Sequence, residues 1–138
     1  MPIDSYSRKT FTPAFAVMVG ATGGATGTIT GAVVDTAGYR ANTFVLLAGL
    51  QATTSMTVTP VILSGTVTGT LASCAAGELI GTEAACASGF TGALTTPGEA
   101  EGIGYMGADR YVRADVVVAN AATGLYAGLW IQEDAIKK

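Results

Sequence analysis

Apolar and polar residues alternate along most of this chain, in short runs that glycine and threonine separate. Runs rich in β-branched and aromatic residues and closed by turn residues are typical of β-strands. The pattern predicts strands over 15–19, 28–35, 42–50, 56–63, 65–72, 102–106, 110–120 and 124–132. Because proline cannot donate to a sheet, Pro60 indicates an edge position or a bulge in its strand.

Helical periodicity is weak throughout. The best helix candidate runs from Ala75 to Ala87, but Gly77 and Gly81 interrupt it. Closely spaced strands with few helices predict an all-β fold, an antiparallel sandwich or barrel of jelly-roll or Ig-like type. The polar segment 1–13 is interpreted as an extended N-terminal arm, and 14–138 as a single β domain.

The stretch from Gly104 to Gly124 shows the clearest alternation. After a turn at Gly107–Asp109, a strand would place one set of side chains on a polar face and the other on an apolar face. The polar set is Tyr111, Arg113, Asp115 and Val117, and the apolar set is Val112, Ala114, Val116 and Val118. We expect the apolar set to meet the core, and Arg113 and Asp115 to pair either with each other or with residues of a neighbouring strand.

The last strand alternates in the same way. Leu125, Ala127, Leu129 and Ile131 share one face, and Tyr126, Gly128, Trp130 and Gln132 share the other. The turn at Asn120–Gly124 predicts that the two strands form a C-terminal antiparallel hairpin. Arg110 and Arg113 are then expected to fix a turn or an interface and to bind no substrate.

Composition narrows the function classes. Charged residues make up 12% of the chain, the net charge is −3 and histidine is absent. The acidic balance argues against a nucleic-acid partner, which requires a basic face. A surface with so few charges is poorly protected against self-association. Low charge therefore predicts a protein that is permanently packed, oligomeric or adsorbed to a surface, with a thermostable or glycine-rich monomer as the alternative.

The sequence offers little catalytic chemistry. Gly20–Gly31 has neither Rossmann nor P-loop spacing, and a strand pattern follows it. Cys74 and Cys86 lack metal-site spacing and are interpreted as free thiols, with a local disulfide as the alternative. The pairs Glu99/Glu101 and Glu78/Glu83 are interpreted as solvated turn charges, since no calcium-loop pattern surrounds them. We expect no enzyme activity, no cofactor, no metal, no secretory signal and no membrane partner.

Two motifs carry a resemblance. The chain has D-x-x-G-Y, then a Val-rich strand, then G-Y-x-G-x-x-R-Y-V-R followed by a Val-rich strand, a turn and a last strand. The matching positions are Asp35, Gly38, Tyr39, Gly104, Tyr105, Gly107, Arg110, Tyr111, Val112 and Arg113. This order resembles a group of small tailed-phage and prophage virion proteins over roughly Asp35 to Ile131. The middle departs from that group, because 64–86 lacks its D-G-S-x-[TY] hairpin.

The resemblance implies a capsid-associated decoration, cement or head-spike protein, made in the host cytoplasm and located on the virion surface. It also implies a homo-oligomer, with a trimer favoured, that contacts the major capsid protein and copies of itself. The expected interface residues are Arg110, Tyr111, Arg113, Asp115, Tyr105 and Trp130. Two alternatives stay open: a head–tail joint, tail or receptor-binding spike component, and a carbohydrate-binding β module that uses Tyr105, Tyr111, Tyr126 and Trp130.

Overall fold

The computed structural model describes residues 9–19, 25–51, 57–88, 99–121 and 124–134. Within these ranges the elements are β1 Lys9–Val19, β2 Ala25–Ile29, β3 Val34–Asp35, β4 Tyr39–Gln51, β5 Thr57–Val67, β6 Thr70–Ser73, the 3₁₀ helix η1 Ala76–Glu78, β7 Leu79–Ile80, α1 Glu83–Ser88, β8 Glu99–Tyr105, β9 Tyr111–Ala121 and β10 Gly124–Asp134. The glutamates at 99 and 101 therefore belong to a strand, and their prediction as turn residues is wrong.

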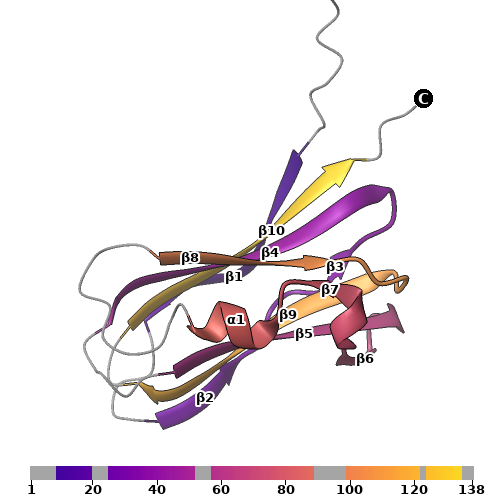
Figure 1. The fold of residues 1–138 in the computed structure, drawn as a ribbon. Helices are drawn as coiled ribbons and strands as arrows, with labels where there is room; N and C mark the ends of the chain where they lie inside the picture. The colour runs from indigo at the N-terminus through magenta and orange to yellow at the C-terminus, as the bar shows by residue number, and fades with distance from the viewer. Residues whose placement is uncertain (1–8, 20–24, 52–56, 89–98, 122–123, 135–138) are drawn as a thin grey trace, which may run out of the picture.

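The strands form two antiparallel sheets that pack on each other. Sheet A has the order β1-β10-β4-β8-β7, and sheet B has the order β2-β9-β5-β6, with β3 also paired to β9. Figure 1 shows β1, β4, β8 and β10 in one layer and β2, β5 and β9 in the other. The predicted all-β sandwich is confirmed, and of the two predicted architectures the closed barrel is excluded.

The core lies between the sheets and follows the period-two pattern of the strands. On β9, Val112, Ala114 and Val116 are fully buried, as the alternation predicts. On β4 and β10, Phe44 and Trp130 are also fully buried, and their ring centroids lie 5.5 Å apart at a tilted angle. These two large rings therefore fill part of the space between the two layers.

The predicted hairpin of the last two strands is wrong. β9 lies in sheet B between β2 and β5, whereas β10 lies in sheet A between β1 and β4. The connection between them crosses from one layer to the other. Alternation identifies the buried face of each strand, but two buried faces can meet across a sandwich without the strands being neighbours in one sheet.

The strand β1 begins inside the segment interpreted as an arm. Lys9–Pro13 is paired with β10, from Lys9 opposite Glu133 to Pro13 opposite Leu129. Residues 1–8 lie outside the described residues. The part of the predicted arm that the structure describes is thus an edge strand of sheet A.

Pro60 occupies a local edge of sheet B. It is buried and lies opposite Val116 of β9, while on the other side β6 pairs only with Leu63–Val67. Backbone N–H groups along a strand point alternately to its two neighbours. The backbone nitrogens of Pro60 and Ile62 therefore both point away from β9. The predicted edge position is confirmed there, and no bulge interrupts the pairing with β9.

The described residues 74–88, which follow β6, contain two short helical turns instead of one helix. Gly81 has a φ of +89° and separates β7 from α1, which fits the weak helical pattern expected there. In Figure 1, η1 and α1 lie along the side of the sandwich between the layers. Glu83 at the start of α1 accepts a hydrogen bond from the backbone N–H of Ile62 at 2.6 Å, so the carboxylate completes the exposed edge of β5.

Candidate association surface

The outer face of sheet A is formed by every second residue of its strands. One row crosses all five strands and holds Phe11, Ile131, Thr43, Gly104 and Ile80. The next row holds Pro13, Leu129, Val45 and Gly102, and a third holds Ala127, Leu47 and Ala100. We call these twelve residues the apolar face, since Thr43 is the one polar side chain among them.

Several side chains of the apolar face are strongly exposed. Ile80 is 64% exposed, Phe11 60% and Leu47 40%. The row at one end of this face carries a charged pair, Lys9 and Glu133, whose Nζ and Oε1 atoms lie 3.2 Å apart. An antiparallel sheet with a solvated outer face normally alternates apolar inside and polar outside. Sheet A departs from that rule, because eleven of the twelve residues of its apolar face lack a polar side chain.

The outer face of sheet B is polar by comparison. It carries threonines of β5 beside the predicted polar set of β9, and Thr59 lies opposite Val117 while Val61 lies opposite Asp115. The predicted pair is confirmed, because Nη2 of Arg113 donates to Oδ2 of Asp115 at 2.8 Å. The Asp115 residue is buried, although its neighbours on this face are only half-buried.

Asp115 also explains why the predicted strand 28–35 is divided. Its Oδ1 atom accepts a hydrogen bond from the N–H of Gly31 at 2.9 Å, between the end of β2 and the start of β3. A Cβ at position 31 would lie 2.1 Å from the carbonyl oxygen of Ala114, so the close approach requires glycine. The next residue, Ala32, donates its N–H to the carbonyl of Ala14 at 2.6 Å and ties this segment to β1.

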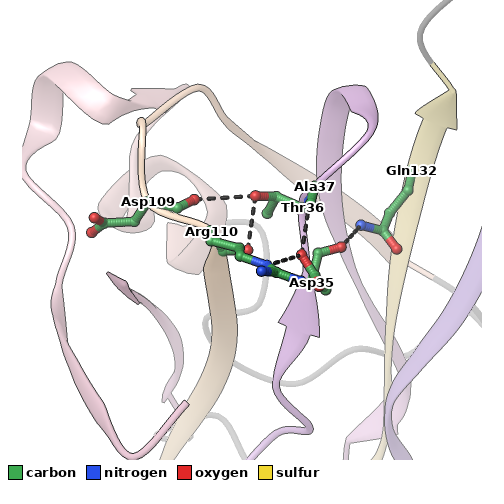
Figure 2. A network of polar contacts seen from close by, with 6 residues as sticks. All are labelled: Asp35, Thr36, Ala37, Asp109, Arg110 and Gln132. Carbon is green, nitrogen blue, oxygen red and sulfur yellow. Dashed lines mark hydrogen bonds and ion pairs between the residues drawn. The ribbon is translucent and has the colours of Figure 1, made fainter. Parts of the chain in front are cut away.

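The two sequence motifs meet at one end of the sandwich. Figure 2 shows the side chain of Arg110 reaching Asp35, where Nη2 and Oδ2 lie 2.8 Å apart and Nε contacts both carboxylate oxygens. The hydroxyl of Thr36 donates to the carbonyls of Asp109 and Arg110, and Gln132 donates to the carbonyl of Asp35. Arg110 therefore fixes a turn, as the spacing predicts.

The charge of Asp35 is stabilised locally. Hydrogen bonds from Arg110 and from the N–H of Ala37 hold the pKa of this carboxyl below its usual range. Gly38, three residues after Asp35, has a φ of +87°, a conformation that side chains other than glycine disfavour. The D-x-x-G-Y motif thus encodes a tight corner that the arginine of the second motif closes.

Tyr105 belongs to the same end of the molecule, but it lies inside. Its residue is 4% exposed, and its hydroxyl accepts a hydrogen bond from the N–H of Asp109 at 3.1 Å. A Cβ at position 107 would lie 2.5 Å from that hydroxyl, so the ring occupies the space that Gly107 leaves open. The side chain of Asp109 in turn accepts a hydrogen bond from Ser64 at 2.8 Å.

The six residues predicted to form an interface therefore divide into two groups. Arg110, Tyr111, Arg113 and Asp115 lie together on or beside the outer face of sheet B. Tyr105 and Trp130 are core residues, 4% and 0% exposed, and present no side-chain surface to another molecule. Tyr126 is 1% exposed, so of the four aromatics that the carbohydrate hypothesis used, Tyr111 alone lies at the surface.

The two cysteines of the chain lie among the described residues. Cys74 and Cys86 are free thiols, as predicted. Burial raises the pKa of the Cys86 thiol to about 11 and also raises that of Cys74, which keeps both thiols protonated at neutral pH. Among the described residues, no three His, Cys, Asp or Glu side chains are grouped to hold a metal ion. The described helices are all too short to cross a bilayer.

Sequence reasoning did not identify the apolar face. Phe11 fell in the segment interpreted as an arm, and Ile80 in the helix candidate. A signal was present in β4, where both alternating sets are mainly apolar: Phe44 and Leu46 point inward, while Val45 and Leu47 point outward. A strand that is apolar on both faces requires cover on both faces.

Comparisons of the chain with known protein families, with curated proteins and with solved structures found no significant match.

Proposed function

We propose that this chain is a structural protein of a tailed-phage virion that binds the outside of the capsid. The observation that carries the proposal is the apolar face of sheet A, which leaves Phe11, Leu47 and Ile80 exposed on an otherwise well-formed sandwich. Exposed apolar patches of this kind mark surfaces that other proteins cover. The absence of histidine and the protonated thiols are consistent with a role in assembly and not in catalysis.

The driving force would come from burying the apolar face against neighbouring subunits. Strand spacing and row spacing give this face an area of roughly 500 Å². At ~25 cal/mol per Å², covering it contributes on the order of 10 kcal/mol before the entropic costs of association are subtracted. Permanent cover also explains how a chain with 12% charged residues avoids indiscriminate aggregation.

The choice of a phage capsid as the assembly rests on the resemblance of the two motifs. In this chain Asp35 and Arg110 form a bidentate ion pair, so the motifs act together although 75 positions separate them. Their role is to hold one end of the sandwich in shape. Proteins that share the two motifs would share this corner of the sandwich.

The proposal is tested on intact particles. Particles induced from the strain that carries the gene are purified, and antibodies against the chain are located on them by immunogold electron microscopy. We expect many labels spread over the shell. Labels at a single vertex or along the tail would replace this proposal with the head–tail joint, tail or spike alternative. Particles without any label would overturn the virion assignment.

A carbohydrate-binding role has less support, because three of its four candidate aromatics are buried. A glycan panel read by the fluorescence of Trp130 is insensitive for the same reason, since this indole is 0% exposed. Tyr111→Ala is the direct control. If the wild type bound a glycan on the panel and this variant did not, the carbohydrate alternative would be supported.

A further inference from the structure

One strand of the apolar face carries almost no side chains. On β8 the outward positions are Ala100, Gly102 and Gly104, which we call the glycine lane. A Cβ added at Gly102 would meet no atom closer than 3.7 Å, so the space above it is open. Beside Gly104 the space is bounded by Ile80, whose side chain lies 3.0 Å from such a Cβ. The glycine lane is therefore a strip one strand wide, bordered by β4 along one side and, beside Gly104 only, by Ile80 of β7 on the other.

A large side chain projects from the opposite side of the same face. Phe11 lies on the edge strand β1, is 60% exposed, and occupies the row that ends at Gly104 and Ile80. Three strand spacings, about 14 Å, separate it from Gly104. The face thus combines a projecting ring with a strip of missing side chains in the same row.

We propose that a second copy of this chain covers the apolar face, and that each copy seats its Phe11 on the glycine lane of the other. This inference rests on the proposed function only in treating the apolar face as an assembly surface. The two-fold axis lies in the interface, parallel to the strands and midway between β10 and β4. It places β1 of one copy over β8 of the other and β10 over β4. Each row of one copy then faces the same row of the other copy. The interface is isologous, so the same contact forms twice.

The contact is favourable for both partners. An aromatic ring over a strand glycine shields exposed backbone and restores the packing that the glycine lacks. At the centre, Leu129 of β10 meets Val45 of the other copy's β4 under the same operation. In the neighbouring rows Ile131 meets Thr43 and Ala127 meets Leu47. The ring of Phe11, the most exposed aromatic whose burial is described, loses its contact with water.

Charge does not oppose a second copy of this chain at the apolar face. A net charge of −3 makes two copies repel each other in general. The apolar face carries no uncompensated charge, because Lys9 and Glu133 at its end form an ion pair with each other. Two such faces bury roughly 1,000 Å² in total, near the lower limit for a specific interface. We therefore expect a concentration-dependent dimer, in place of the trimer that the resemblance implies.

The first test fills the glycine lane without disturbing the fold. Gly102→Val adds a strand-forming side chain where only contacts at 3.7 Å await it, and Gly27→Val is the matched control in β2 of sheet B, where nothing lies within 4 Å. Sedimentation velocity of the full chain across a concentration series gives the association constant, and thermal unfolding confirms the fold. We expect Gly102→Val to weaken dimerisation at least tenfold and Gly27→Val to leave it unchanged.

Phe11→Ser is the second variant, and it tests the same contact if Gly102→Val fails to fold. Its side chain is 60% exposed, so its loss leaves the core intact while removing the ring. We expect the same tenfold weakening. Equal association constants for the wild type and Phe11→Ser, or a wild type that sediments as a trimer or as a monomer at every concentration, would overturn the inference.

Cross-linking identifies the contact directly. Benzoylphenylalanine is placed at position 11, and equal amounts of ¹⁴N and ¹⁵N chains are mixed before irradiation. We expect cross-links between labelled and unlabelled chains that map to Glu99–Tyr105. Cross-links confined to one chain, or mapping to sheet B, would contradict the proposed seat of Phe11.

The inference and the proposed function fail separately. If the chain dimerises through the apolar face but is absent from purified particles, the virion role is wrong and the inference stands. If the chain decorates particles in many copies but does not pair through Phe11, the virion role stands and the inference is wrong.

Discussion

The two outer faces of this sandwich follow different rules, although strands of the same alternating kind build both. On sheet B, the outward residues of β9 are Tyr111, Arg113, Asp115 and Val117, and an ion pair lies among them. On sheet A, the outward residues of β4 and β10 are almost all apolar. On sheet B, hydrogen bonds within the chain hold the Arg113 and Asp115 side chains, although Nε of Arg113 is buried with no hydrogen-bond partner among the described residues. Sheet A instead exposes apolar side chains that the described part of the chain does not cover.

This contrast reverses the expectation drawn from the sequence. Arginines and an aspartate at regular spacing suggested an interface, but their partners turn out to be each other, Asp35 and Gly31. In a sequence of low charge, polar residues on a strand suggest an interface. The stronger indication of a partner is the strand where polar residues are missing from both faces.

The largest effect is expected from a charge placed at the centre of each outer face. Val45 of sheet A and Val61 of sheet B are matched: both are half-buried, outward valines on interior stretches of a strand. Val45→Lys buries an unpaired ammonium in the associated state and should weaken association by about 100-fold, or ~2.7 kcal/mol. Val61→Lys lies opposite Asp115 and should change association less than threefold.

Sedimentation velocity checks both variants, with thermal unfolding as the control for folding. If Val61→Lys weakened association as much as Val45→Lys, the distinction between the two faces would be lost.

A smaller effect, on stability, is expected from the polar groups of sheet B. Asp115→Ala removes the acceptor for the Gly31 N–H and the partner of Arg113, and should lower the free energy of unfolding by about 2 kcal/mol. Arg113→Ala removes only the ion pair, whose arginine side chain is 26% exposed, and should cost about 1 kcal/mol.

Urea unfolding of the two variants and of the double variant forms a mutant cycle for this pair. A coupling energy of zero would mean that the ion pair contributes nothing and that Asp115 acts through Gly31 alone.

The smallest effect is expected at the corner that joins the two motifs. Because Arg110 and the Ala37 N–H lower the pKa of Asp35, its carboxylate stabilises the folded state above the ordinary pKa of 3.8. That contribution is lost as pH falls through the lowered pKa. Asp35→Asn should therefore unfold more easily than the wild type at pH 6, and the difference should shrink toward pH 2.

Thermal unfolding of both chains across this pH range gives the difference, and subtraction cancels the other titrating groups. A difference that stays constant down to pH 2 would show that the ion pair with Arg110 does not stabilise the fold.

Much of the secondary structure was predictable because it depends on local pattern. The alternation of Val112 to Val118 identified the buried face of β9, and the spacing of Arg113 and Asp115 identified their pairing. The order of strands was not predictable from the same pattern. The turn after Asn120 is compatible with a hairpin or with a crossing between layers. The structure has the crossing, because β10 pairs with β1 and β4 of sheet A, where Trp130 lies opposite Phe44.

The candidate surface was harder to predict for a related reason. Its row joins Phe11, Ile131, Thr43, Gly104 and Ile80, which lie far apart in the sequence. No short window contains the patch, and a strand register is needed to assemble it. Low overall charge indicated that such a surface exists, but composition does not locate it.

The central claim is that the apolar face of sheet A, and not the outer face of sheet B, is covered when the chain associates. The most direct measurement is thiol labelling of Val45→Cys and Val61→Cys in a chain whose Cys74 and Cys86 are replaced by serine and alanine. Labelling rates with a maleimide are compared between dilute and concentrated protein. We predict that the Val45→Cys rate falls at least tenfold on association while the Val61→Cys rate stays constant. Equal rates at position 45 in both states, or protection at position 61 alone, would contradict the account.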